Sequence, residues 1–476
     1  MLAGLLDIVR IDEWDPGTGS VTSWHGSPAS RAKAMAAPVS TVPASYMQAQ
    51  HIRGFHEFAE RGLDYSRMIS VSWDQPGQCD LRAMNYVINA HLRRHDTYRS
   101  WFEWKDEGRI VRHTMQNPND VKFVPTKRGQ MSAKDFQQVI QDTPDLNGWD
   151  CFQFGIIQYE EHFTFYFIVD HVHVDPMMMG TLYVEIHQIY EMIRQGGAPP
   201  ALPEPSGYDD FCVRQHQLTS SLSAESPEVR RWVDFTSAND GALPDFALPL
   251  GDPDAKCGGA VMVVQLMNGE QTQKFESACI AAGARFVGGV FAAAAVAQYR
   301  LTGVDSYFGM TPKDLRTKPE EYVTTGWFTG MIPVDVPVVD GSFAQTVRAA
   351  QKSFDGNTDL AQVPFDRVLE LVPRLRRSHR GFPMLAYLDA GLPPLSAVVA
   401  SKAGDANART FCDGLSPAHI CMWVGRVGDE TSLTVFYPDN AIARDSVNRY
   451  VEAMQEVYVG VAEGREVAVT SMRETA

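Results

Sequence analysis

Two stretches rich in proline and glycine divide the chain. Residues 197–209 (GAPPALPEPSGYD) and residues 240–258 lie near the middle of the 476-residue sequence. Such stretches interrupt helices and strands, because proline lacks a backbone N–H and glycine is conformationally free. On each side of them, runs typical of strands alternate with runs typical of helices. The sequence therefore predicts an α/β protein of two similar halves, joined near residues 200–260 by a helical connector.

Apolar periodicity predicts the elements of each half. In residues 45–61, for example, Tyr46, Ala49, Ile52 and Phe55 recur at helical spacing. Runs of β-branched and aromatic residues predict strands, and short polar segments between two such runs predict hairpins. By these criteria we expect helices at residues 45–61, 81–94, 177–195, 271–282, 287–301 and 445–459, and strands at 68–73, 98–104, 109–115, 152–158, 163–169, 306–311, 331–338, 384–389, 420–427 and 432–437.

These elements suggest a division of the chain into four parts. Residues 1–44 are rich in Gly, Pro, Ser and Ala, with Trp14 and Trp24 as anchors, and we expect them to form an extended arm draped over the body. The remaining boundaries place the first half at residues 45–210, the connector at 211–260 and the second half at 261–476.

The composition is that of a globular protein. With 44% hydrophobic and 21% charged residues, a disordered or collagen-like chain is excluded. The net charge of −16 argues against a nucleic-acid partner, since phosphate binding relies on clustered Lys and Arg. Seven scattered cysteines without a CxxC pair indicate neither a zinc knuckle nor a disulfide framework. A secretory signal pattern is missing at the start, and the longest apolar window, residues 287–297, is too short for a bilayer. We expect a cytoplasmic protein, with peripheral membrane contact left open.

One segment combines an apolar strand with a cluster of polar side chains. Residues 165–169 (FYFIV) lead directly into Asp170, His171, His173 and Asp175, and a helix is expected to follow at once. Turns between strands and helices are where α/β proteins expose catalytic side chains. This segment is therefore the candidate active site.

Three interpretations of the cluster remain open on the residues alone. In H-x-x-x-D, His171 is a general base for a hydroxyl or amine, because histidine titrates near neutral pH, and Asp175 holds the loop by pairing with an arginine. In H-x-H-x-D, His171, His173 and Asp175 bind one metal ion. That spacing resembles the H-x-H-x-D-H signature of metallo-β-lactamase-like hydrolases, although Pro176 replaces the last histidine. In the third interpretation, the histidines are packed structural residues.

Four segments resemble motifs of the condensation-domain superfamily. Residues 45–48 (SYMQ) match its S-x-x-Q opening motif, and residues 94–102 (RHDTYRSWF) resemble R-H-x-x-L-R-T-x-F. Residues 170–176 (DHVHVDP) stand in the place of H-H-x-x-x-D-G, and residues 326–333 (GWFTGMIP) resemble G-x-F-x-N-x-x-P. The four occur in family order and at family-like spacing, within about residues 40–460. The set is far more specific than any one of its members.

Within the superfamily, the chain most resembles the mycobacterial polyketide-associated acyltransferases, in particular the branch that acylates trehalose in cell-envelope glycolipids. The phrases VSTVPASYMQAQHIRGF, RAMNYVINAHLRRHDTYRSWF and YPDNAIARDSV carry this resemblance. It implies two chloramphenicol-acetyltransferase-like subdomains that form a V, with the active site in a tunnel between them. It also implies transfer of a long-chain fatty or polyketide acyl group from a thioester to a trehalose hydroxyl.

The resemblance assigns the chemistry to the H-x-x-x-D residues. His171 matches the second histidine of the family motif, which is the general base, and Asp175 matches the supporting aspartate. We expect Asp175 to pair with Arg94 or Arg99 of the R-H-x-x-x-R segment. A covalent acyl-enzyme is not needed, in agreement with the lack of a G-x-S-x-G elbow.

Substrate-binding roles are expected for several neighbours of the base. Asp170 replaces the first histidine of the motif, and His173 is either part of the acceptor pocket or a packed neighbour. Pro176 replaces the motif glycine and fixes the local backbone. The other candidates are Lys313, with Asp314 and Arg316 beside it, which follow a predicted strand, and Trp327 and Thr329, which fall in the family's crossover segment.

Neither a metal nor a cofactor is expected besides the acyl donor, which is acyl-CoA or an acyl carrier protein. The expected partners are trehalose or a trehalose glycolipid, a long-chain acyl thioester and a polyketide synthase. We expect a monomer that works in the cytoplasm, with the inner face of the membrane left open as a site of association. Two alternatives also stay open: a metal-dependent hydrolase that uses His171, His173 and Asp175, and a non-catalytic lipid-binding partner of a polyketide synthase.

Overall fold

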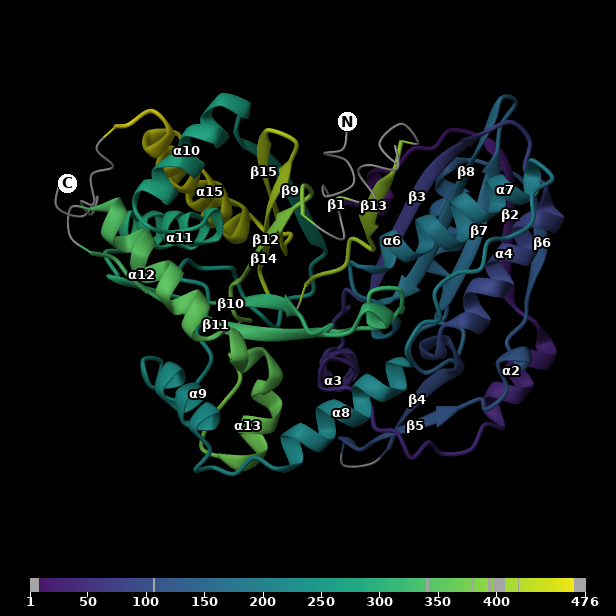
Figure 1. Cartoon of the computed structure of the whole chain (residues 1–476), viewed down its shortest axis with the longest axis horizontal. Helices are drawn as coiled ribbons and strands as arrows, with labels where there is room; N and C mark the ends of the chain where they lie inside the picture. Colours follow the sequence, from purple (N-terminus) through teal and green to yellow (C-terminus); the bar gives the residue numbers. More distant parts are fainter. Residues whose placement is uncertain are drawn as a thin grey trace.

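Two large β-sheets organise the chain, one in each half of the molecule (Figure 1). The computed structural model describes residues 8–105, 108–339, 342–378, 381–392, 396, 407–417 and 419–465. The sheet of the first half has the strand order β1-β13-β3-β8-β7-β2-β6 and is antiparallel except for the pair β1–β13. Its strands are β1 (Ile8–Arg10), β2 (Gly19–Gly26), β3 (Met68–Pro76), β6 (Phe123–Met131), β7 (Phe152–Gln158), β8 (His162–Asp170) and β13 (Arg409–Cys412).

Strand β8 is buried on both faces. Its odd-numbered residues from Phe163 to Val169 pack into the core that contains α4 and α7, whereas Tyr166 and Ile168 pack against α5 on the other face. A strand held in this way fixes the position of the residues that follow it. The helices of this half are α2 (Pro28–Met35), α3 (Tyr46–Glu60), α4 (Leu81–Arg94), α5 (Ala133–Gln141), α6 (Met178–Leu182) and α7 (Ile189–Arg194), and β4 (Ser100–Trp104) and β5 (Ile110–Thr114) form a separate hairpin.

The helix predicted at residues 177–195 contains a π-helical turn. This turn, Tyr183–Gln188, lies between α6 and α7. It carries Glu185, which is buried and contacts α4. The prediction of one helix here is confirmed apart from this local widening.

The prediction that residues 1–44 form an arm is wrong for the described residues 8–44. Strand β2 lies inside the first sheet, between β7 and β6, and Trp24 is fully buried. Thr22 and Ser23 are buried beside it. Small polar residues at buried positions remove the apolar alternation by which a strand is recognised in a sequence.

The sheet of the second half is covered by a layer of helices. Its strand order is β11-β10-β12-β14-β15-β9, in which β10, β12 and β14 are parallel. Alanine-rich α11 is the central helix, and its residues from Val290 to Ala297 are fully buried. The elements are β9 (Gly259–Met267), α10 (Gly269–Ala281), α11 (Phe286–Thr302), β10 (Ser306–Asp314), β11 (Thr329–Pro337), α12 (Phe343–Gly356), α13 (Phe365–Leu371), β12 (Met384–Asp389), β14 (Cys421–Val427), β15 (Glu430–Pro438) and α15 (Ala441–Ala462).

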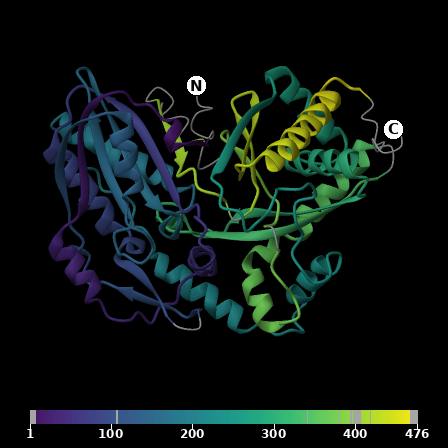
Figure 2. The ribbon, with the colours of Figure 1, turned by 180° about the vertical axis from the view of Figure 1, so that it is seen from behind.

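Helices α3 and α8 connect the two halves. Two helices, α8 (Tyr208–Ser220) and α9 (Pro227–Ser237), lie where the helical connector was expected, and both views show α8 passing below α3 (Figures 1 and 2). In α3, Ile52 packs into the core of the first half and Met47 packs against that of the second. The region between the halves is thus built around α3.

The second half of the sequence also contributes one strand to the first sheet. β13 comes from the second half of the sequence, between β12 and β14, yet it pairs with β3 and β1 in the first sheet (Figure 1). The boundary drawn at residues 261–476 therefore does not hold for Arg409–Cys412. The short length of β13 and its distance from its partners in sequence hide this pairing from local patterns.

None of the helices described here is by itself long and apolar enough to cross a membrane. α10 and α11 pass the length and composition criteria only together, and they are bent by 95° at their junction.

Candidate active site

The candidate active site is the 3₁₀ turn of residues 171–173 at the end of β8. Asp170 caps this turn, because its Oδ1 accepts a hydrogen bond from the Val172 N–H at 3.0 Å. The first N–H of the turn donates to the Arg67 carbonyl (2.8 Å), and the side chain of Gln48 in α3 donates to the Val172 carbonyl (2.8 Å). The turn is therefore held by its own strand, by the start of the neighbouring strand β3 and by α3.

His171 presents a neutral imidazole between the two halves. Its ring stacks on the indole of Trp327, with centroids 3.8 Å apart and an interplanar angle of 26°. The residue is partly exposed, whereas its Nδ1 is buried and has no hydrogen-bond partner among the described residues. Burial lowers the pKa of His171 to about 4, and the nearby His51 lowers it too, while backbone groups and Asp170 act in the opposite direction. At neutral pH the ring is free to take up a proton.

Asp170 is fully buried and cannot contact a substrate in this structure. Its Oδ1 lies 2.9 Å from Nε2 of His51, and its Oδ2 accepts from the guanidinium of Arg67 at 3.1 Å. Burial alone would raise the pKa of Asp170, but His51 and Arg67 hold it below its usual range. The expected substrate-binding role of Asp170 finds no support in this arrangement and stays a prediction. Its carboxylate organises the turn instead.

Asp175 pairs with Arg316, and the expected pairing with Arg94 or Arg99 is wrong. The two nitrogens Nη1 and Nη2 of Arg316 donate to the two carboxylate oxygens at 2.8 and 3.1 Å. The Phe328 N–H donates to the same carboxylate at 2.9 Å. Both charged side chains are buried. Because Asp175 belongs to the first half and Arg316 to the second, this bidentate pair joins the halves beside His171.

Arg94 and Arg99 lie elsewhere in the first half. Arg94 Nε donates to Glu185 Oε1 at 2.7 Å, and Arg99 contacts the Gln116 carbonyl at 3.5 Å. Sequence proximity within the R-H-x-x-x-R segment favoured them as partners of Asp175. Asp175 pairs instead with Arg316, which belongs to the second half and is more than 100 residues away in the sequence.

His173 is a packed neighbour of the base and not part of an exposed pocket. Its ring is buried against Tyr98 and Phe152, and its Nδ1 lies 3.2 Å from the Thr97 hydroxyl. Burial lowers the pKa of His173 to about 4. Of the two roles considered for His173, part of the acceptor pocket or packed neighbour, the structure supports the packed neighbour.

The metal-site interpretation of His171, His173 and Asp175 is not supported, because the three side chains face different partners. Within the described ranges, the single His/Cys/Asp/Glu group with metal-compatible spacing is His91, His95 and Glu185. There His95 Nδ1 accepts the Thr325 N–H at 3.2 Å, so its proton is on Nε2 and donates to Glu185. Arg94 occupies the other oxygen of Glu185. Burial alone would raise the pKa of Glu185, but His95 and His91 lower it below its usual range. These hydrogen bonds account for the cluster as a structural network.

The remaining candidates lie where the second sheet approaches the base. Lys313 is near the end of β10, opposite Gly330 of β11, and Thr329 is opposite Asp314. Lys313 and Thr329 are partly exposed. Trp327 is the candidate that the structure brings into contact with His171.

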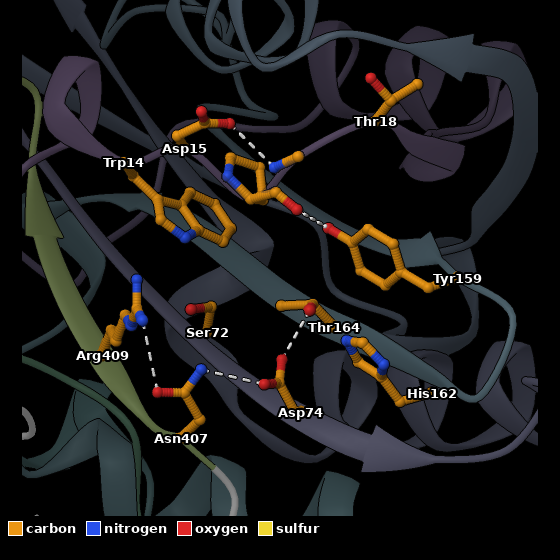
Figure 3. Close-up of a pocket in the computed structure, with 12 residues that line it drawn as sticks. Trp14, Asp15, Thr18, Ser72, Asp74, Tyr159, His162, Thr164, Asn407 and Arg409 are labelled. Carbon is orange, nitrogen blue, oxygen red and sulfur yellow. Dashed lines mark hydrogen bonds between the residues drawn. The ribbon is translucent and has the colours of Figure 1, made fainter.

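A cavity of about 380 Å³ lies on the outer face of the first sheet, well away from His171. Its polar side chains bond to one another: Thr164 and Asn407 both donate to Asp74, at 2.6 and 3.0 Å (Figure 3). Thr164 is six residues before Asp170 on the same strand, which separates the cavity from the turn by about 20 Å.

Sequence patterns did not identify His51, Tyr65 and Arg67, which lie behind the turn. One signal was available: His51 follows Ser45 and Gln48 at three-residue intervals on one face of the helix. Tyr65 and Arg67 lie in a loop and at a strand start, without any pattern that marks them.

The family model for the condensation domain matches residues 40–383. The chain belongs to the condensation-domain family. Among curated relatives of this condensation-domain chain, the 2'-acyl-2-O-sulfo-trehalose (hydroxy)phthioceranyltransferase PapA1 of Mycobacterium tuberculosis is 51% identical over 98% of the chain and 90% of the relative. The acyltransferase PapA3 of M. tuberculosis is 48% identical over 97% of the chain and 98% of the relative. The trehalose-2-sulfate acyltransferase PapA2 of Mycobacterium bovis is 47% identical over 97% and 98%.

Solved structures agree with this assignment. The structure of a PapA2 acyl transferase superposes with a TM-score of 0.92, at 48% identity over 96% of this condensation-domain chain and all of the other. The condensation domain of the monacolin K polyketide synthase MokA superposes with a TM-score of 0.68 at 13% identity, covering 91% of this chain and 100% of that one, and so shares the fold. The expected architecture of two chloramphenicol-acetyltransferase-like subdomains is confirmed.

Proposed function

We propose that this chain is an O-acyltransferase that moves a long-chain fatty or polyketide acyl group from a thioester to a hydroxyl of trehalose or 2-sulfated trehalose, in the synthesis of cell-envelope glycolipids. The observation that carries the proposal is the identity of 47–51% to trehalose-glycolipid and related acyltransferases over nearly the whole chain. The turn that presents His171 supports it, because a general base is the group that such a transfer requires.

In the proposed reaction, His171 takes the proton of the sugar hydroxyl as the hydroxyl oxygen attacks the thioester carbonyl carbon. The tetrahedral intermediate then collapses, the carbon–sulfur bond breaks, and His171 returns the proton to the departing thiolate. Nδ1 is buried, so Nε2 is the nitrogen that we assign to this proton transfer. The donor is acyl-CoA or an acyl carrier protein, and the substrates meet in the tunnel expected between the halves.

The role of Asp175 in this proposal is to position the turn. Its carboxylate is bound on both oxygens by Arg316 and receives the Phe328 N–H, so it is not free to exchange protons with a substrate. Because Trp327 precedes Phe328, the same pair also fixes the indole that stacks on His171. Trp327, Thr329 and Lys313 are the proposed contacts to substrate from the second half.

The substitution His171→Ala tests the proposal. We expect acyl transfer from a panel of acyl-CoAs to trehalose and to trehalose 2-sulfate, followed by mass spectrometry, to fall by about 10²- to 10⁴-fold, which is the usual contribution of a general base. His162→Ala, at the opposite end of β8, is the matched control and should retain the wild-type rate. Normal transfer by the His171→Ala variant would refute the role of His171, and no product with either sugar from the wild-type enzyme would refute the acceptor.

A further inference from the structure

Three aromatic rings from three parts of the chain meet behind the candidate base. His51 of α3 lies 6.1 Å from the ring of His171 and 5.5 Å from the indole of Trp327, measured between centroids. His171 and Trp327 stack on each other at 3.8 Å. His51 is buried, so its interactions take place in a site of low dielectric. A second imidazole therefore lies next to the one to which we assign proton transfer.

The negative charge in this site faces His51. Oδ1 of the fully buried Asp170 lies 2.9 Å from His51 Nε2. On the other side of the ring, the hydroxyl of Tyr65 lies 3.4 Å from His51 Nδ1, and it can either donate a proton to that nitrogen or accept one from it. Both nitrogens of His51 thus have a polar partner, whereas Nδ1 of His171 has none among the described side chains and backbone groups.

The other charges around the site are already paired. Arg67 donates to the second oxygen of Asp170 at 3.1 Å. On the far side of the turn, Asp175 and Arg316 neutralise each other. A proton added to His51 therefore makes the group of Asp170, Arg67 and His51 net positive. Two imidazoles so close together resist simultaneous protonation, because like charges repel strongly in a buried site.

We propose that His51 and Asp170 form a positioning pair that keeps His171 unprotonated, and so ready to act as the base, because Asp170 holds the imidazole of His51 beside that of His171, where a positive charge on either ring opposes one on the other. The proposal rests on the proposed role of His171. Asp170 replaces the first histidine of the family motif, and His51 lies on the helix that begins with S-x-x-Q. The hydrogen bond between their side chains links these two motifs in this chain. Burial is the first cause of the lowered pKa of His171 and His51 is the next, whereas the charge of Asp170 acts in the opposite direction.

Selective ¹³C labelling of the histidine Cε1 atoms tests the pair in the free protein. The His171 signal, one of 13, is identified by its loss in His171→Ala. In His51→Gln, which removes the second imidazole and keeps a donor for Asp170, we expect the titration midpoint of His171 to rise by about one pH unit. The acid limb of kcat/KM for acyl transfer should move up by the same amount.

A second substitution should shift the titration midpoint of His171 in the opposite direction. In the double variant His51→Gln, Asp170→Asn, the carboxylate that favours any nearby positive charge is lost, so the midpoint should move back down relative to His51→Gln alone. His51→Phe also removes the second imidazole and should give the same rise as His51→Gln, which keeps the test available if the double variant does not fold. His56→Gln, on the same helix but stacked on Trp104, is the matched control and should leave the midpoint unchanged.

The outcomes separate this inference from the proposed function. An unchanged His171 midpoint in folded His51→Gln, in a protein that loses activity in His171→Ala, would overturn the inference and leave the proposed function intact. Normal activity of His171→Ala would overturn the proposed function and remove the basis of the inference. A purely structural role for His51 would lower stability without moving the midpoint, and this result also counts against the pair.

Discussion

At the scale of single residues, the contact between Asp175 and Arg316 decides how the two halves meet at the base. A bidentate pair fixes both the separation and the orientation of its partners. The guanidinium also lies 4.3 Å above the ring of Phe328, the residue whose N–H binds Asp175. Charge, hydrogen bonding and packing therefore act on the same three residues, next to the indole of Trp327.

Substitution of Arg316 by alanine should destabilise the protein strongly, because it leaves the Asp175 carboxylate buried without its cation. We expect the free energy of unfolding to fall by about 3–5 kcal/mol, as for other broken buried pairs. Arg99→Ala is the control, since the one hydrogen bond of this side chain among the described residues goes to a carbonyl at 3.5 Å, and its cost should stay below about 1 kcal/mol. Denaturant unfolding followed by tryptophan fluorescence measures both, and equal costs would contradict the assignment of Arg316.

At the scale of elements, α3 shows which contacts of the site the sequence predicts and which it does not. The start of α3 can be predicted from the sequence, because Ser45 and Gln48 form a capping box. In it, each side chain accepts a hydrogen bond from the backbone N–H of the other residue. Its amphipathic spacing predicts its length closely. The sequence does not reveal that Gln48 also reaches the Val172 carbonyl, because that contact depends on how α3 packs against the end of β8.

The variant Gln48→Glu separates these two functions of one side chain. A carboxylate still accepts the Ser45 N–H but cannot donate to the Val172 carbonyl, so α3 stays capped while the turn loses one of its supports. We expect the rate of acyl transfer to fall by about tenfold or more, since small displacements of catalytic groups are costly, with little change in helix content by circular dichroism. Ser45→Ala provides the converse case, with an expected loss of about 1 kcal/mol in stability. A wild-type rate in Gln48→Glu would show that this support is dispensable.

At the scale of the whole molecule, the two-half architecture follows from the order of motifs and elements along the chain. The predicted helices at residues 81–94 and 287–301 and the hairpin β7–β8 coincide with observed elements within a residue or two. Two of the failures share one cause: β2 and β13 belong to the first sheet through pairings between distant segments. A short strand that pairs with a distant segment shows no periodic pattern in the sequence. Asp175 and Arg316 are also far apart in the sequence, so local patterns do not predict their contact.

Stability should fall as the pH falls from about 6.5 to 4. Burial is the largest cause that lowers the pKa to about 4 in five histidines: His25, His95, His171, His173 and His419. In the unfolded chain each titrates near 6.5. Between these values the unfolded state binds more protons, so the free energy of unfolding decreases with decreasing pH. The measurement is Tm by calorimetry across this range.

The net charge gives a contrasting expectation. At −16 the folded chain repels itself, and this repulsion weakens on acidification, so charge alone would make Tm rise as the pH drops. A rising Tm would therefore contradict the histidine argument. His419→Phe, which replaces a titratable imidazole stacked on Phe382 by an uncharged ring, should make the fall in Tm less steep.

The position of β13 in the first sheet has a consequence for the synthesis of the protein on the ribosome. β3 is covered by β13 only after residue 412 has been synthesised, whereas every other strand of the first sheet is complete by residue 170. While the ribosome translates the second half, the nascent chain carries an open sheet edge, which is a template for wrong pairing with other chains. Closing this edge must wait for residues 409–412, so the first half depends on the second to complete its sheet.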